Sequence, residues 1–230
     1  MIHLRIDDRE IEIKEGRTVL QAAREYGIPI PTLCYHEALE PFAACRLCVV
    51  ELESANGSQL VAACAYPCQE GLIVHTNSEL VRRSRRVTVE LLMATSAHVP
   101  VIQGLAATLG VEKPRFVLPA DPCILCGLCV RACHEIVGVA AISLINRGME
   151  KRISPPFRIA SSDCIGCGTC VLVCPTGAIT LTDITGDSQT AHCWPSVFER
   201  QRCYLCGPQD LHPVFADIED PSVDKREIVP

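Results

Sequence analysis

Residues 123–133 read Cys-Ile-Leu-Cys-Gly-Leu-Cys-Val-Arg-Ala-Cys, and residues 164–174 read Cys-Ile-Gly-Cys-Gly-Thr-Cys-Val-Leu-Val-Cys. Both runs have the spacing C-x2-C-x2-C-x3-C. Three thiolates at this spacing can bind one iron–sulfur cube, and the fourth lies on a following helical turn that points at the other cube. We therefore assign one [4Fe–4S] cluster to Cys123, Cys126, Cys129 and Cys174, and another to Cys164, Cys167, Cys170 and Cys133.

Zinc is the competing ligand for clustered thiolates. Zinc ribbons use two separated cysteine pairs, whereas this chain repeats an identical run of four, and this difference favours clusters. The chain has 16 cysteines in 230 residues. Its first residues lack a basic stretch followed by an apolar run, so we expect no secretory signal, a cytoplasmic location and reduced thiols. Metal binding is then a better explanation of the cysteines than disulfides.

A second cysteine set lies upstream, at Cys34, Cys45, Cys48 and Cys64. It combines a close pair with one distant cysteine on each side. This is the arrangement of the plant-type [2Fe–2S] site, C-x4-C-x2-C…C, with a longer first gap. The spacing therefore predicts a [2Fe–2S] cluster near the N-terminus.

Two resemblances follow from these motifs. Residues 115–182 resemble the bacterial two-cluster ferredoxin domain, with His134 where many such domains have proline. Residues 1–97 resemble the N-terminal part of the large iron–sulfur subunit of respiratory complex I, a domain shared with diaphorase subunits of NAD-linked hydrogenases and formate dehydrogenases. The matching motifs are Pro31-Thr-Leu-Cys34-Tyr-His36, Ala44-Cys45-Arg46-Leu-Cys48, Ala63-Cys64 and Gly71-Leu-Ile-Val-His-Thr76.

The second resemblance implies a β-grasp fold for residues 1–77, with Cys64 as the fourth ligand and Cys68 as a spare cysteine. His36 and His75 are expected to pack or form hydrogen bonds rather than bind iron. In that family a His-plus-three-Cys motif for another [4Fe–4S] cluster follows the next helix. Here His98 survives, but no cysteine lies between Cys68 and Cys123. We interpret this segment as a degenerate motif without its cluster.

Hydrophobic patterning predicts the elements around these motifs. Alternating isoleucines and leucine predict a hairpin over residues 2–13, and Thr18 and Gly27 bound a predicted helix. Residues 49–53 and 72–76 are predicted strands, residues 78–97 a helix, and residues 141–153 a hairpin. The arginines of the longer helix suggest a solvated face, with a docking patch for an acidic protein as the alternative: Arg82, Arg83, Arg85 and Arg86.

The predicted fold class is α+β. We divide the chain into a β-grasp [2Fe–2S] domain over residues 1–77, a helical connector over 78–119, a two-[4Fe–4S] ferredoxin domain over 120–183, and a cysteine-containing tail over 184–230. No stretch approaches the ~20 apolar residues of a membrane span. The formal net charge of -6 argues against nucleic acid as the main partner.

The sequence contains no nucleophile–base constellation, phosphate loop or G-x-G-x-x-G fingerprint. We therefore expect a non-catalytic subunit that relays single electrons between a flavin- and NAD(P)-binding subunit and a catalytic subunit, a hydrogenase or a formate dehydrogenase. Two alternatives stay open: a free multi-cluster ferredoxin, and a redox sensor. The fusion of two ferredoxin types argues against the free carrier, because a mobile carrier needs only one.

Three further cysteines, Cys193, Cys203 and Cys206, lie in the tail. The C-x2-C pair followed by Gly207 is typical of a metal knuckle, because glycine lets the loop turn tightly around the ion. A further [4Fe–4S] cluster or a zinc ion would fit, and so would incidental reduced thiols. Candidate fourth ligands are His192, His212, Cys68 and a residue of a partner chain.

Overall fold

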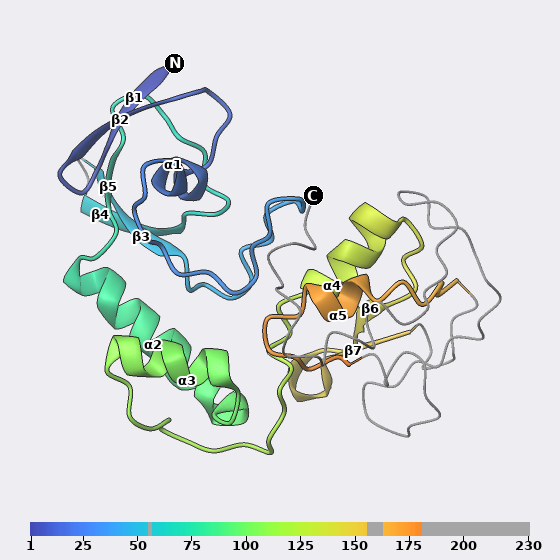
Figure 1. Cartoon of the computed structure of the whole chain (residues 1–230). Coiled ribbons are helices and arrows are strands. Elements are labelled where there is room, and N and C mark those ends of the chain that lie inside the picture. Colours follow the sequence, from blue (N-terminus) through green and yellow to red (C-terminus); the bar gives the residue numbers. More distant parts are fainter. Residues whose placement is uncertain (55–56, 156–162, 181–230) are drawn as a thin grey trace, which may run out of the picture. The chain divides into compact units, whose positions relative to one another are not determined.

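The computed structural model describes residues 1–54, 57–155 and 163–180 (Figure 1). The chain divides into two compact units. The first comprises Met1–Leu128 and Val173–Ala178, and the second comprises Cys129–Leu172 together with residues 179–180, both taken over the described residues.

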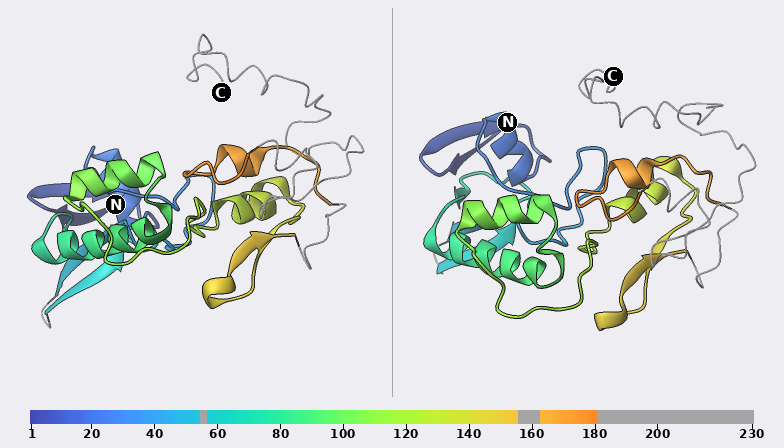
Figure 2. Two further views of the ribbon diagram at one scale, coloured as in Figure 1. Left: turned by 90° about the horizontal axis from the view of Figure 1, so that it is seen from below. Right: turned by 60° about the horizontal axis from the view of Figure 1, so that its bottom comes forward.

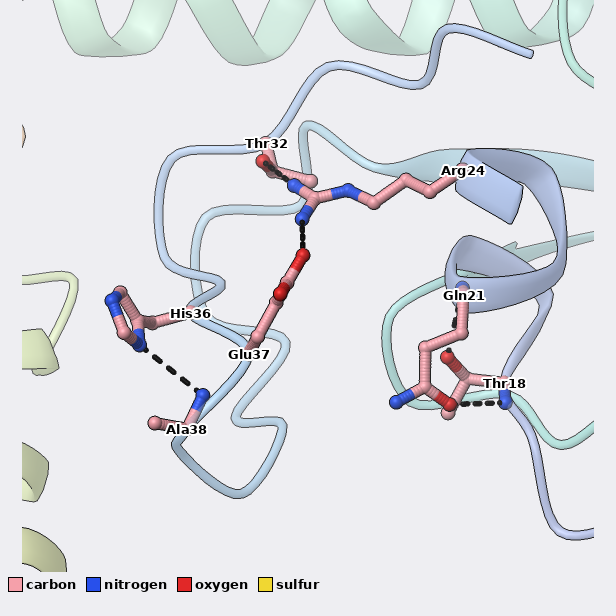
Figure 3. A network of polar contacts seen from close by, with 7 residues as sticks. All are labelled: Thr18, Gln21, Arg24, Thr32, His36, Glu37 and Ala38. Atoms are coloured by element: carbon pink, nitrogen blue, oxygen red, sulfur yellow. Dashed lines mark hydrogen bonds and ion pairs between the residues drawn. The ribbon is translucent and has the colours of Figure 1, made fainter. Parts of the chain in front are cut away.

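The first unit begins with the predicted hairpin. Strands β1 (Ile2–Ile6) and β2 (Arg9–Ile13) are antiparallel, and their alternation buries the side chains of every second residue. Helix α1 (Val19–Glu25) follows. Its N-terminus is closed by a capping box, in which Thr18 Oγ1 accepts from the Gln21 backbone and Gln21 Oε1 accepts from the Thr18 backbone (Figure 3).

Three more strands complete a five-stranded sheet with the order β2-β1-β5-β3-β4. They are β3 (Val49–Ser54), β4 (Gly57–Ala62) and β5 (Ile73–His75). β5 runs parallel to β1 and antiparallel to β3, so the sheet is mixed. One core holds apolar side chains of this sheet and of α1. This is the expected β-grasp arrangement, and only β4 was not predicted from the sequence.

Two helices follow the sheet. Helix α2 (Glu79–Ser96) is capped by Ser78, whose Oγ accepts from the Val81 backbone, and α3 (Pro100–Leu109) ends at Gly110 with a left-handed φ of 66°. The helices pack against each other, and their apolar core includes Leu33 and Leu47. These two leucines neighbour Cys34 and Cys48 in the chain, so the helical pair supports the cysteine loops of the β-grasp domain.

The cysteine runs lie on short elements, seen in two further views in Figure 2. The first run continues into α4 (Leu128–Arg131) and the π-helix η1 (Ala132–Val137), and the second into α5 (Thr169–Leu172). Between them β6 (Ser143–Ile145) and β7 (Arg152–Ser154) form the predicted hairpin, with a 3₁₀ turn η2 (Gly148–Glu150) at its tip. The α+β fold class is confirmed. No helix in the described part of the chain is both long and apolar enough to span a membrane.

Candidate iron–sulfur sites

The structure brings the four predicted N-terminal cysteines together. Cys34, Cys48 and Cys64 are each at most 2% exposed. The Sγ atoms of Cys48 and Cys64 lie 3.4 Å apart, and the backbone N–H of Cys45 donates to Cys34 Sγ at 3.4 Å. The charges of Cys48, Cys34 and Cys45 all act on Cys64, so the four thiols form one electrostatic group.

Hydrogen bonds divide this group into two donor–acceptor pairs. The Cys34 thiol bonds to Cys45, which raises the pKa of Cys34 and lowers the pKa of Cys45 to about 5. Cys64 bonds to Cys48 in the same way, raising its own pKa and lowering the pKa of Cys48 to about 7. Thiolates are the metal-binding form of cysteine, and these shared hydrogen bonds place the sulfurs close enough to act as one ligand group.

Backbone conformation and side-chain bracing both shape these loops. Ala43 and Arg46 have left-handed φ values of 55° and 56°, which turn the chain around Cys45. The Arg24 guanidinium from α1 bonds to Thr32 Oγ1 at 3.3 Å and to Glu37 Oε1 at 3.1 Å, spanning the segment that contains Cys34 (Figure 3). Sequence reasoning did not identify Arg24 as a loop brace.

The position of Arg85 differs from the solvated helix face that we expected. We expected the four α2 arginines to form a solvated face, but Arg85 is only 6% exposed. Its Nε donates to the Leu47 carbonyl at 3.1 Å, and its Nη2 donates to the Val49 carbonyl at 2.8 Å. Burial lowers the pKa of Arg85, and the charge of Cys48 acts in the opposite direction.

The other helix arginines remain accessible. Arg82 and Arg86 line a cleft of about 1220 Å³ together with Arg9, Arg24 and the buried Arg85. The Arg82 guanidinium pairs with Glu79 at 2.8 Å, and Arg86 Nε donates to the Leu109 carbonyl at 2.9 Å. The docking patch for an acidic protein is therefore a hypothesis for these residues and not for Arg85.

Cys68, His36 and His75 each have defined local surroundings. Cys68 is 6% exposed, and burial alone raises its pKa to about 11, with no contribution from another cysteine. His36 Nδ1 accepts from the Ala38 backbone at 3.2 Å (Figure 3), and His75 Nε2 pairs with Glu53 Oε2 at 3.1 Å. The structure thus places Cys68 outside the four-thiol group and gives both histidines local partners.

In the first unit, Cys123 lies near Cys126 and Cys174. Burial raises the pKa of Cys123 to about 11, and the charges of Asp121, Cys126 and Cys174 add to this shift. Cys174 belongs to the second sequence run, yet its charge acts on a cysteine of the first. Cys129, 5% exposed, is the first residue of the second unit.

In the second unit, Cys133 joins the cysteines of the other run. A cavity is lined by Cys133, Cys164, Cys167 and Cys170 and by apolar side chains of η1 and the following segment. Burial raises the pKa of Cys170 to about 12, and the charges of the other three cysteines add to it. The backbone N–H of Ala141 donates to Cys133 Sγ at 3.3 Å. Cys133 therefore lies with the run to which it does not belong in sequence.

The two runs share one backbone pattern. Leu125 and Gly127 have left-handed φ values of 53° and 75°, and the equivalent Gly166 and Gly168 have 64° and 70°. Left-handed residues between the cysteines make the loop curl around a common centre. His134 is exposed on η1.

The loop between Cys34 and Cys45 lies close to the first cysteine run. A Cβ placed on Gly127 would lie 3.5 Å from Cε1 of the Phe42 ring, and Cys45 and Ile124 pack against the same apolar core. Phe42 lies between Cys34 and Cys45, so the two cysteine loops of the first unit are neighbours.

The chemistry of these groups fits iron–sulfur clusters. The thiols are buried or half-buried, and backbone N–H groups donate to their sulfurs, as cluster ligands require. Within the described residues, no three Cys, His, Asp or Glu side chains converge closely enough for a single metal ion. The tail cysteines Cys193, Cys203 and Cys206, and the histidines near them, lie outside the described residues.

Known protein families match both the N-terminal part of the chain and the part that contains the two cysteine runs. A family described as a 2Fe-2S iron-sulfur cluster binding domain matches residues 1–79. A family described as a 4Fe-4S dicluster domain matches residues 122–178. The chain thus contains one [2Fe–2S]-type domain and one dicluster [4Fe–4S]-type domain.

Two curated relatives extend this result. An NADH-quinone oxidoreductase polypeptide of Rhizobium meliloti is 33% identical over 206 residues, covering 78% of this chain and 24% of the relative. NADP-reducing hydrogenase subunit HndD of Solidesulfovibrio fructosivorans is 33% identical over 211 residues, covering 78% of this chain and 36% of the relative. The chain thus spans roughly a quarter to a third of the length of these relatives.

A solved structure matches over a larger share of its own length. A chain of the NAD+-reducing [NiFe]-hydrogenase in its H2-reduced state has a TM-score of 0.56 and 34% identity, and the match covers 67% of this chain and 74% of that one. The protein therefore belongs to the family of iron–sulfur subunits found in NADH-quinone oxidoreductases and in NAD(P)-linked hydrogenases.

Proposed function

We propose that this chain relays single electrons between a flavin- and NAD(P)-binding subunit and a catalytic subunit of a cytoplasmic oxidoreductase complex, such as a hydrogenase or a formate dehydrogenase. The observation that carries the proposal is the closeness of the Phe42 ring to Gly127. It brings the predicted [2Fe–2S] loop next to the first predicted [4Fe–4S] loop, as a relay requires. The relatives named above are themselves subunits of NAD(P)-linked oxidoreductases.

The proposed inventory is three clusters. The [2Fe–2S] cluster is held by Cys34, Cys45, Cys48 and Cys64. One [4Fe–4S] cluster is held by Cys123, Cys126, Cys129 and Cys174, and the other by Cys164, Cys167, Cys170 and Cys133. The grouping of thiols supports these sets, since Cys174 acts on Cys123 and Cys133 lines the cavity of the second run.

The proposed domain division follows the same sites: a β-grasp domain over 1–77, a connector over 78–119, a dicluster domain over 120–183 and a tail over 184–230. Apolar packing between α2 and α3 supports the connector as a structural element. His98, beside the start of α3, is exposed and has no cysteine near it in the sequence. These features support the interpretation that the connector has lost the cluster of its family.

We expect the isolated full chain, purified anaerobically, to oxidise neither NADH nor NADPH and to activate neither hydrogen nor formate. The reason is that every proposed iron has a complete thiolate set and the sequence has no dinucleotide fingerprint. Absorbance loss of the clusters after NAD(P)H addition measures the reaction, with dithionite as the positive control. Adding a flavin-bearing diaphorase subunit should restore reduction by NAD(P)H, whereas direct oxidation by the flavin-free chain would overturn the relay proposal.

The tail cysteines form a separate proposal: Cys193, Cys203 and Cys206 hold a further cluster or a zinc ion. We expect the double variant Cys203→Ser/Cys206→Ser to lose about four irons if the site holds a [4Fe–4S] cluster, or one zinc if it holds zinc. Elemental analysis of iron and zinc in the variant and the unaltered chain measures both. Unchanged iron and zinc would mean that the three cysteines are incidental thiols.

A further inference from the structure

Arg85 is a buried cation without a carboxylate partner in ion-pair range among the described residues. It is 6% exposed, and both of its recorded hydrogen bonds go to backbone carbonyls, those of Leu47 and Val49. The charged groups that act on it are Cys48 and Asp7. Asp7 is already engaged, since its carboxylate accepts from Thr76 N and Thr76 Oγ1 at 2.7 Å.

The two carbonyls flank Cys48 on either side. A guanidinium is a planar fork whose donors point in fixed directions, so two bonds from one fork fix the backbone before and after this cysteine. The fork comes from α2, whose apolar neighbours Val81 and Val89 lie one turn away on each side and are both fully buried. Helix α2 therefore holds the fork rigidly against the loop.

The charge of this fork has a second consequence. Buried charges are screened much less by solvent and salt than exposed ones. The potential of an iron–sulfur cluster depends on the charge and hydrogen bonds around it. Reduction of the proposed [2Fe–2S] cluster adds one negative charge beside the guanidinium, so a fixed positive charge favours the reduced state.

We infer that Arg85 is a positioning residue of the [2Fe–2S] site, which clamps the backbone on both sides of Cys48 and raises the reduction potential of the cluster through its buried charge. The inference rests on the proposed [2Fe–2S] ligand set and goes beyond it, because Arg85 binds no iron.

The test is an EPR-monitored redox titration of the anaerobically purified full chain, in which dithionite supplies the one electron that the cluster accepts. For Arg85→Gln we expect the equilibrium constant for reduction to fall at least about tenfold, which is about 59 mV for one electron. The matched control is Arg83→Gln, which removes an exposed charge from the same helix. It should stay within about twofold of the unaltered chain, because solvent and salt screen an exposed charge.

Arg85→Lys separates charge from geometry. Lysine keeps the charge but lacks the planar fork, so we expect about threefold change or less in the equilibrium constant, with altered g-values from the loosened loop. Equal effects of Arg85→Gln and Arg83→Gln would overturn the inference. If Arg85→Gln does not assemble, a fall of about tenfold or more in Arg85→Lys would overturn it, because the charge is retained. Absence of any [2Fe–2S] signal in the unaltered chain would instead refute the proposed cluster.

Discussion

Replacing Cys64 with alanine is expected to abolish the [2Fe–2S] EPR signal of the reduced protein, whereas replacing Cys68 with alanine should preserve it. Both thiols are buried, and they lie only four positions apart in the sequence. Cys64 Sγ lies 3.4 Å from Cys48 Sγ and interacts with all three other proposed ligands. None of these three cysteines shifts the pKa of Cys68, which burial alone raises. A cluster that loses one of four thiolates has no other cysteine of the group to replace it.

Each variant is the matched control for the other, because each removes one buried thiol from the same apolar core. The cavity itself should cost each variant roughly 1 kcal/mol of stability. Thermal unfolding should show a larger loss for Cys64→Ala, because that variant also loses the stabilisation that a bound cluster gives the folded state. Loss of the signal in Cys68→Ala with retention in Cys64→Ala would reverse the ligand assignment and contradict the grouping of thiols described above.

The second large effect is expected at Cys133. Replacing it with serine should disrupt the cluster held by Cys164, Cys167 and Cys170, not the cluster of its own run. The physical reason is that Cys133 lies on η1 and lines the cavity formed by the second run. Iron content in double variants distinguishes the two assignments, because two changes in one cluster are not additive.

Cys133→Ser combined with Cys164→Ser should lose about four irons, since both changes strike one cluster. Cys133→Ser combined with Cys123→Ser should lose about eight, since the changes strike two clusters. The reverse ordering of these losses would show that each run supplies all four ligands of its own cluster. Cys174→Ser provides the symmetrical control: it should behave as a partner of Cys123, whose electrostatic environment it shares.

Cysteine spacing and hydrophobic alternation were sufficient to predict most of the fold. The hairpin at the N-terminus, the capped helix α1 and the long helix α2 all follow from local patterns that tertiary packing reinforces. Strand β4 was missed because its first half, Gly57-Ser-Gln, is polar and exposed, so it does not alternate like a half-buried strand. Pairing with β3 along its full length forms this strand despite its composition.

Arg85 shows a different reason for a missed prediction. Its sequence neighbours Arg82, Arg83 and Arg86 suggest a solvated face, and local charge density dominated the interpretation. The signal that identifies it is helical periodicity: Val81, Arg85 and Val89 are spaced by four residues and therefore share the buried face of α2. No sequence pattern identifies the acceptors of its hydrogen bonds. They are backbone carbonyls of a distant loop, and every residue type has such a carbonyl.

The closeness of the Phe42 ring to Gly127 was likewise beyond sequence reasoning. Phe42 stands in the long gap between Cys34 and Cys45, where the family spacing fixes no residue, and Gly127 belongs to a separate motif. Only the folded first unit brings the two loops together. The proposed relay depends on this tertiary feature as much as on the cysteines.

Reversible electron uptake tests the relay most directly. The anaerobically purified full chain is titrated with dithionite, reoxidised with a mild oxidant and titrated again, with iron and acid-labile sulfide measured before and after. The account predicts about three electrons per chain, one for each of the three proposed clusters, with about ten irons retained through both cycles; a further [4Fe–4S] cluster in the tail would raise these values to about four electrons and fourteen irons. Uptake of about one electron or less, or loss of iron and sulfide on reoxidation, would contradict the relay and favour a redox sensor.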